Sequence, residues 1–325
     1  MKKTLVFLLI FTTGSVLFAQ QGSVPDGLTT IIVGNDENDA VYWINGIRNV
    51  LPKSSVRRND FARARDVAIS NPNIYIVGMD VNGSYDAVYW LNGVKNVLPR
   101  SSDYASANGI AISGSNVFII GNDGDDAVYW LNGIKNVLPR SGDRASASSI
   151  AISGSNVYIT GSDGDNAVYW LNGTRNVLLR AGNRAIAEGI TISGSNVYIT
   201  GEDGNHAVYW LNGNRNILPR SSEDWSRAID VAISSSNVYI TGFDGDNIVY
   251  WLNGVKHILS TIYNHGSAIS IAIADSNVYI AGYDGADDGS DIGNEAVYWL
   301  NGVRNILPTT SRTVLRVARK IIVIQ

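Results

Sequence analysis

Short apolar runs alternate with polar turns along most of the chain, and the segment 108–140 shows the pattern clearly. Its apolar runs lie at 110–112, 117–120, 127–131 and 134–138. Turn-forming residues bound each run, and no stretch shows a helical apolar period with caps. The segment therefore predicts four short antiparallel strands that follow one another as a meander.

The turns and faces of these strands indicate how such units pack. The dipeptide Asn132-Gly133 separates the last two runs, and it favours a type I′ hairpin because both central residues need positive φ. The third run reads Val-Tyr-Trp-Leu, so both faces of the sheet are apolar and both must be covered. The fourth run carries Lys or Arg in every unit, which is typical of an outer edge strand. Radial stacking of four-stranded sheets satisfies all of these features.

The unit is repeated along the chain. The string Val-Tyr-Trp-(Leu or Ile)-Asn-Gly occurs seven times, at intervals of 40 to 48 residues. Such a period indicates stacked supersecondary units. The tryptophans of the seven strings are Trp43, Trp90, Trp130, Trp170, Trp210, Trp251 and Trp299.

One unit is split between the two ends of the chain. Residues 29–34 align with the second run of later units, so the first unit lacks its first strand. Residues 318–324 align with first runs such as 64–70. Six complete units, three strands at the start and one at the end make seven. We therefore expect the final strand to pair with 29–34 and to close a ring.

The repeated strings VYWLNG and SGSNVYITG, together with the split unit, resemble those of secreted, repeat-built seven-bladed β-propellers of bacteria. The resemblance covers about 29–325, and the strings differ from the Gly-His and Trp-Asp signature of WD40 repeats. It implies an all-β fold with four-stranded antiparallel blades. It implies little about activity, because propellers support binding and catalysis alike.

The N-terminal residues differ from the repeats. Lys2 and Lys3 precede a mostly apolar run at 5–18, and Ala19 follows. This layout predicts a signal peptide at 1–19, a short linker at 20–28 and a propeller at 29–325, with the protein secreted, periplasmic or at the bacterial cell surface. An uncleaved N-terminal anchor is the alternative. We expect no membrane span in the mature chain, since no second apolar stretch is long enough.

Composition narrows the range of partners. The chain has 325 residues, a formal net charge of −4 and no Cys. Without a basic surface, nucleic acid is not an expected partner, and the missing Cys excludes disulfides, thiolate zinc sites and Cys nucleophiles. We expect a monomer.

One loop position varies between units that are otherwise nearly identical. It lies between a fourth strand and the next first strand, directly after an Asp or Asn. Alternate turns of a meander lie at the same end, so we expect these loops to form a ligand-binding ring around a central opening; drift in solvated loops is the alternative. The acidic or amide residues are Asp60, Asp103, Asp143, Asn183, Asp224 and Asn264. The varying residues are Phe61, Tyr104, Arg144, Arg184, Trp225 and His265.

The insertion at 284–295 suggests a Ca²⁺ site. Asp284, Asp288 and Glu295 are its candidate ligands, and the spacing from Asp284 to Glu295 matches a twelve-residue calcium loop. Ala286 occupies a ligand position, however, and no flanking helices are predicted. Hairpin chemistry alone also accounts for acidic turns of this kind. We expect no other cofactor.

These features favour an exported, non-catalytic binding module that recognises a glycan or a protein. Catalytic motifs are sparse: His206, His257 and His265 fall in different units, and no nucleophile elbow is present. One alternative is a propeller lyase or hydrolase with its site at the central opening, where His265, Arg144 and Tyr104 would be the first suspects. The other is a structural envelope or surface protein without a discrete ligand.

Overall fold

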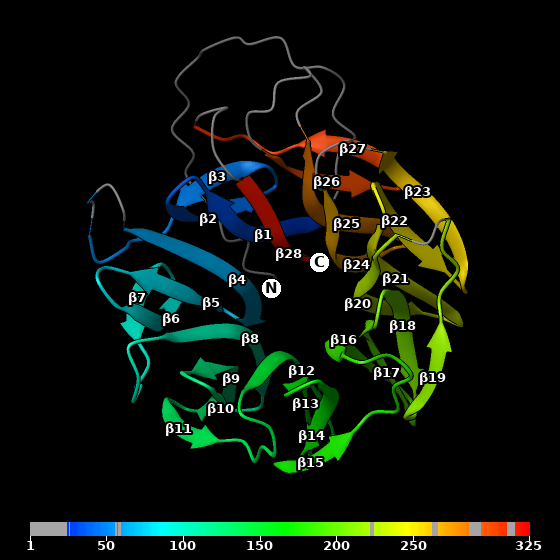
Figure 1. Cartoon of the computed structure of the whole chain (residues 1–325). Coiled ribbons are helices and arrows are strands. Elements are labelled where there is room, and N and C mark those ends of the chain that lie inside the picture. The colour runs from blue at the N-terminus through cyan, green and yellow to red at the C-terminus, as the bar shows by residue number, and fades with distance from the viewer. Residues whose placement is uncertain are drawn as a thin grey trace, which may run out of the picture.

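The structure is a computed structural model that describes residues 25, 27–55, 57, 60–221, 224–261, 266–285, 294–310 and 316–325. The predicted signal peptide at 1–19 lies outside this part of the chain. The described residues form seven four-stranded antiparallel sheets, arranged as the blades of a ring in Figure 1. The chain is thus a seven-bladed β-propeller. Within the described ranges, no helix has the length and hydropathy needed to cross a bilayer.

Each blade uses its four strands in the same order from the centre outward. The innermost strands are β4 (Phe61–Ser70), β8 (Ala105–Ser113), β12 (Ala145–Ser153), β16 (Ala185–Ser193), β20 (Ser226–Ser234), β24 (Ser267–Ala274) and β28 (Arg316–Ile324). The second strands are β1 (Thr29–Asp36), β5 (Asn73–Val81), β9 (Asn116–Asp123), β13 (Asn156–Asp163), β17 (Asn196–Asp203), β21 (Asn237–Asp244) and β25 (Asn277–Gly285). The third strands are β2 (Asp39–Ile44), β6 (Tyr85–Leu91), β10 (Asp126–Leu131), β14 (Asn166–Leu171), β18 (His206–Leu211), β22 (Asn247–Leu252) and β26 (Asn294–Leu300). The outermost strands are β3 (Ile47–Val50), β7 (Val94–Val97), β11 (Ile134–Val137), β15 (Thr174–Val177), β19 (Asn214–Ile217), β23 (Val255–Thr261) and β27 (Val303–Ile306).

The ring closes by pairing the two ends of the repeat region. Strand β28 lies antiparallel beside β1, with Ile324 opposite Thr29 and Ile321 opposite Ile32. The resulting sheet has the order β28-β1-β2-β3, so its innermost strand comes from the C-terminus. This confirms the closure that the split unit predicts.

The repeated Trp forms the core between neighbouring blades. Trp130 and Val128 are fully buried and pack on Ile110 and Val77, while Tyr129 packs into the next interface. Alternate residues of one strand therefore serve two interfaces, as the apolar pattern on both faces predicts. In six blades the buried indole N–H also donates to a backbone carbonyl of the preceding blade's final loop, at 2.7–2.9 Å.

A second repeated feature joins the edge strand to the loop beyond it. In each blade a buried Asp ends or nearly ends the second strand and pairs with the Lys or Arg of the fourth strand. In the third blade Asp123 also accepts the backbone N–H groups of Ser101 and Ser102, at 2.7 and 2.9 Å. The edge cations are thus partners of buried carboxylates as well as edge charges. The pairs are Asp36–Arg48, Asp80–Lys95, Asp123–Lys135, Asp163–Arg175, Asp203–Arg215, Asp244–Lys256 and Asp284–Arg304.

The innermost strands are longer than the apolar runs predict. The run at 110–112 extends to β8 (Ala105–Ser113), because the added residues are small or polar. Ala105 and Ala107 are buried in the core between blades, whereas Asn108 faces the centre. Each innermost strand passes very close to a Gly of the second strand. A Cβ added at Gly161 would lie 1.8 Å from the carbonyl oxygen of Ser146, beside Ala147. This contact explains why every blade pairs Gly with Ala at that point.

Candidate functional site

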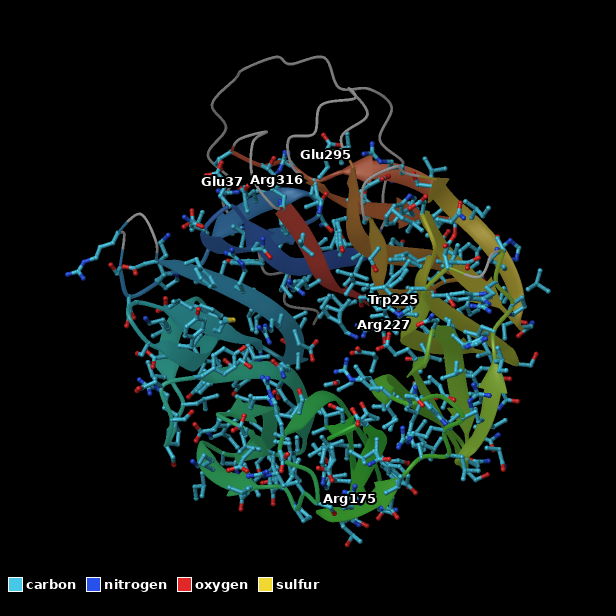
Figure 2. The ribbon with its side chains drawn as sticks, viewed as in Figure 1. Glu37, Arg175, Trp225, Arg227, Glu295 and Arg316 are labelled. Carbon is cyan, nitrogen blue, oxygen red and sulfur yellow. The ribbon has the colours of Figure 1, made fainter. Side chains whose placement is uncertain are left out.

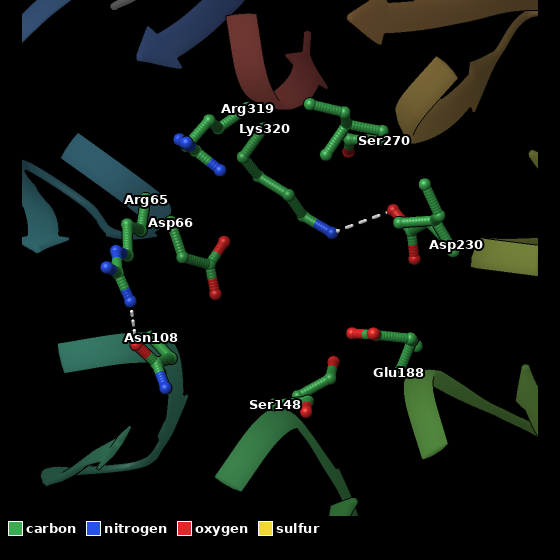
Figure 3. A pocket seen from close by; sticks show the side chains of 13 residues that line it. Arg65, Asp66, Asn108, Ser148, Glu188, Asp230, Ser270, Arg319 and Lys320 are labelled. Carbon is green, nitrogen blue, oxygen red and sulfur yellow. Dashed lines mark hydrogen bonds and ion pairs between the residues drawn. The ribbon is translucent and has the colours of Figure 1, made fainter. Parts of the chain in front are cut away.

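A β-bulge interrupts every innermost strand directly after this Ala. The ladder skips at least one residue there, for example between Ala147 and Ser149. The skipped side chains line a central channel with a cavity of about 290 Å³, shown in Figure 3. They are Arg65, Asn108, Ser148, Glu188, Ile229, Ile269 and Arg319.

One side of the channel is basic. The Arg65 guanidinium donates to Asn108 and to the sulfur of Met79. Arg319 also lines the channel, and among the described residues it makes no hydrogen bond or ion pair. Burial and the nearby guanidinium groups of Arg65 and Arg63 lower the pKa of Arg319 to about 10. Positive charge is therefore concentrated here, and neither Arg65 nor Arg319 forms an ion pair with a carboxylate of the described residues.

The channel wall also carries carboxylates, with Asp230 across the cavity from the arginines and Asp66 next to Arg65 on β4 (Figure 3). Lys320 Nζ lies 3.1 Å from Asp230 Oδ2, and Figure 3 shows this side chain crossing toward Asp230. Asp66 accepts the backbone N–H groups of Val67 and Ile110 at 2.8 and 2.9 Å. Burial nevertheless raises the pKa of Asp66, and the nearby Asp230 adds to the rise. Asp230 and Asp66 thus already have an ion-pair or hydrogen-bond partner.

The channel opens into a wider mouth at the loop face. This mouth is a cavity of about 720 Å³, lined by Trp225, Phe243, Tyr283 and Arg319 among others. Figure 2 places Trp225 and Arg227 beside the central opening. Four residues, Arg319 among them, line both cavities, so the mouth and the channel are adjacent.

Trp225 is held in a fixed orientation at this mouth, although 48% of its surface is exposed. Its indole N–H donates to Glu202 Oε2 at 2.8 Å, and its ring meets Phe243 edge to face with centroids 5.0 Å apart. Arg227 donates to the same Glu202 oxygen at 2.8 Å and lies 3.2 Å from Glu188 Oε1. A chain of contacts therefore joins the exposed indole to the channel wall.

The structure places the other predicted aromatic ring members together. Tyr104 is 38% exposed and packs on Tyr85 with ring centroids 4.9 Å apart, and Phe61 meets Tyr85 at 6.3 Å. These loops share a face with the turns between second and third strands, since Gly124 donates its N–H to the carbonyl of Tyr104. The shared face is as the meander predicts.

The remaining predicted ring residues are spread around this face. Arg184 is exposed and lines a further cavity of about 740 Å³ together with Trp225. Arg144 is exposed and lines none of the three described cavities. His265 lies outside the described residues. Of the acidic members, Asp60 is buried, whereas the other three, Asp103, Asp143 and Asp224, are exposed. The ring as a whole stays a prediction.

The candidate calcium ligands face an arginine. Arg304 donates to Asp284 Oδ2 at 2.9 Å and to Glu295 Oε2 at 2.7 Å. The equivalent Asp of every other blade has a Lys or Arg partner, so the Asp284 contact needs no metal. Asp288 lies outside the described residues. Across the part of the chain that the structure describes, no three His, Asp or Glu side chains gather closely enough to hold a metal ion.

Comparisons with known proteins support the fold. No family model matches the chain, and no curated protein matches it. A solved structure of virginiamycin B lyase from Staphylococcus aureus is similar over 78% of this chain and 94% of its own, with a TM-score of 0.55 and 10% identity. U3-55K is similar over 79% of this chain and 89% of its own, with a TM-score of 0.51 and 12% identity. At these identities the likeness shows the fold alone.

Sequence reasoning missed the channel, although a signal for it exists. Comparison between repeats singled out only the loop position. Three residues further along, the same comparison meets an Ala that all seven blades share. The residue after that Ala also varies, with five residue types in the seven blades. Small or polar residues in an innermost strand break the apolar pattern, so the strand seemed to begin later than it does.

Proposed function

We propose that the chain is a non-catalytic binding module that recognises a glycan at the mouth of the central channel. The observation that carries this proposal is Trp225. Arg227 lies over one face of this half-exposed indole, 5.2 Å from the ring centroid. The indole N–H is already bonded, so the surface that stays exposed is apolar ring, which packs well on the C–H face of a sugar. Glu202, Phe243 and Arg227 hold it in one orientation, so binding orders few side chains.

The shape of the site favours a glycan chain over a protein surface. A protein partner usually needs a broad contact area of about 800 Å² per side. The mouth is instead concave and narrows into the channel, which suits the end or a bend of an oligosaccharide. Hydroxyl groups of a sugar would find acceptors in Glu188 and the exposed Asp224, both of which line the mouth. We place this binding outside the cytoplasm, because the N-terminus reads as an export signal.

A glycan array tests this proposal with a matched pair of variants. Trp225→Ala should weaken binding about thirtyfold, which corresponds to ~2 kcal/mol for a buried aromatic contact. Arg144→Ala changes the equivalent loop position of another blade, away from the cavities, and should leave the affinity within twofold of wild type. Both variants should keep the wild-type melting temperature within a few degrees. Equal binding by wild type and Trp225→Ala would contradict the proposal.

A second candidate, a lyase or hydrolase, is favoured by one observation. Burial, with the nearby Glu202, raises the pKa of Glu188 despite the opposing effect of Arg227. A carboxyl group with a raised pKa in an enclosed site is a competent proton donor. Mass spectrometry of the bound glycans after prolonged incubation separates the two functions. Shortened products that disappear in Glu188→Gln would favour the enzyme, and intact glycans support the binding module.

A further inference from the structure

Three guanidinium groups lie close together on the basic side of the channel, those of Arg65 and Arg319 in its wall and that of Arg63 near both. None of them forms an ion pair with a carboxylate of the described residues. Asp39, which pairs with Lys53, acts on Arg63 only from beyond ion-pair distance. Arg63 donates to the backbone carbonyls of Glu37 and Ala62, and Arg65 donates to Asn108 and Met79. Arg319 makes no hydrogen bond or ion pair within the described part of the chain, and its Nε atom is buried. The fourth-strand cations of the seven blades all have an Asp partner, so this cluster departs from the rule of the fold.

Burial of the three guanidinium groups of this cluster, and repulsion between them, disfavour their charged forms. Burial and Arg65 lower the pKa of Arg63 to about 10, and burial with both other guanidinium groups does the same to Arg319. Both groups still carry full charge at neutral pH, because a pKa of about 10 lies well above pH 7. Positive charges that repel one another in a partly enclosed site are stabilised by an anion from outside.

The carboxylates of the channel do not supply that anion, whether they lie across it, as Asp230 and Glu188 do, or next to Arg65 on β4, as Asp66 does. Asp230 lies 3.1 Å from Lys320 Nζ, and Glu188 lies 3.2 Å from Arg227 Nη1. Asp66 is held by two backbone N–H groups, and Lys320 is its main cationic neighbour. Each of these carboxylates therefore has its own partner, and Arg319 is left facing the cavity.

The position of Arg319 links this cluster to the mouth. Arg319 lines the mouth together with Trp225, and it also lines the channel together with Arg65. We propose that the ligand is an acidic glycan, and that Arg319 and Arg65 bind the carboxylate of a uronic acid residue while the indole of Trp225 contacts a sugar ring at the mouth. This inference rests on the proposed function and names the class of glycan.

A carboxylate suits the site better than a doubly charged group. The planar guanidinium fork pairs with two carboxylate oxygens at once. Glu188, Asp230 and Asp66 line the same channel and would repel a second negative charge, as on a phosphate monoester. The site therefore favours a single negative charge, spread over two oxygens in a plane.

The test uses three trisaccharides with the same linkage: a hexuronate, its carboxyl-reduced neutral counterpart and a neutral trisaccharide bearing one sulfate ester. Isothermal titration calorimetry should show the hexuronate bound at least tenfold more tightly than the neutral sugar. Arg319→Gln should weaken hexuronate binding about tenfold to a hundredfold, as expected for loss of a charged hydrogen bond, and should leave the neutral sugar unaffected. Arg140→Gln, an exposed arginine paired with Asp126, is the matched control and should change neither affinity.

Several outcomes would overturn this inference. One is equal affinity of wild type for the hexuronate and the neutral sugar, and another is hexuronate binding that Arg319→Gln leaves intact. Binding of the sulfate ester as tight as the hexuronate would overturn the preference for a carboxylate. If Trp225→Ala weakens both sugars while Arg319→Gln weakens neither, the acidic class is wrong and the glycan-binding function stands. If wild type binds no glycan of the array, the proposed function itself fails.

Discussion

The outer part of each blade and the wall of the channel treat charge in opposite ways. At the outer edge, each fourth-strand cation pairs with a buried Asp at 2.5–2.9 Å, seven times over. In the channel, Arg319 faces the cavity without a hydrogen-bond or ion-pair partner among the described residues, and the equivalent positions of the other blades carry Arg, Asn, Ser, Glu or Ile. The same ion pair recurs at every outer edge because each blade has to hold its fourth strand and the following loop in place. The channel varies because each blade contributes a different group to one shared space.

We expect the stability of the fold to be most sensitive at the close backbone contact between the first and second strands of a blade. Gly161→Ala places a Cβ 1.8 Å from the carbonyl oxygen of Ser146, and backbone cannot move aside as a flexible side chain does. We expect a loss of more than ~4 kcal/mol in the free energy of unfolding, or no folded protein. Gly114→Ala is the control, since its turn is open and only its positive φ of 59° is strained, at a cost of ~1 kcal/mol. Urea unfolding of the two variants measures the difference, and similar losses would contradict this account of the Gly–Ala pair.

The edge ion pair should matter next. Burial opposes ionisation of Asp123, but the hydrogen bonds from Lys135 and Ser102 hold the pKa of this carboxyl below 3.8. Asp123 therefore contributes stability above pH 3.8, and that contribution is lost as the pH falls through its lowered folded-state pKa. Asp123→Asn should cost about 3 kcal/mol at pH 7, as for a broken buried pair. The cost should shrink in urea unfolding at pH 2.5, and an equal cost at both pH values would show that charge is not involved.

The corresponding change in the channel should have the smallest effect, with the opposite sign. The pKa of Asp66 is raised above 3.8 by burial, so its charge opposes folding once the pH rises through the folded-state pKa. Asp66→Asn removes that charge and should raise the free energy of unfolding at pH 7 by less than ~1 kcal/mol. A loss of unfolding free energy as large as that of Asp123→Asn would mean that Asp66 stabilises the fold as Asp123 does.

The same contrast explains what the sequence could predict. Strong sequence patterns predict the blades and their closure. They are the strand that carries the buried Trp130 and its six counterparts, the Asn-Gly turns, and the split unit that pairs Ile321 with Ile32. Each depends on local rules of strand pattern and turn chemistry, so the fold and its closure follow from the chain alone. The loop residue Trp225 is predicted as a candidate binding residue because it varies between otherwise identical repeats, and its role stays a prediction.

The channel was missed because its residues obey no local rule. Arg319 and Glu188 sit in strands whose alternation is broken by a bulge, and a bulge leaves no clear mark in one sequence. Their proximity depends on ring closure, which brings β28 beside β24 and also beside β4, a strand at the other end of the chain. Only the three-dimensional arrangement shows that Arg65 and Arg319 share a cavity.

Tryptophan fluorescence gives the most direct test of the claim that ligand binds at the mouth of the channel. Of the eight Trp, seven are fully buried and Trp225 alone is exposed. Quenching by the neutral agent acrylamide therefore reports on Trp225, and saturating hexuronate trisaccharide should reduce it to the level of Trp225→Ala. Unchanged quenching, while calorimetry registers binding of the same sugar, would place the ligand elsewhere and contradict the account.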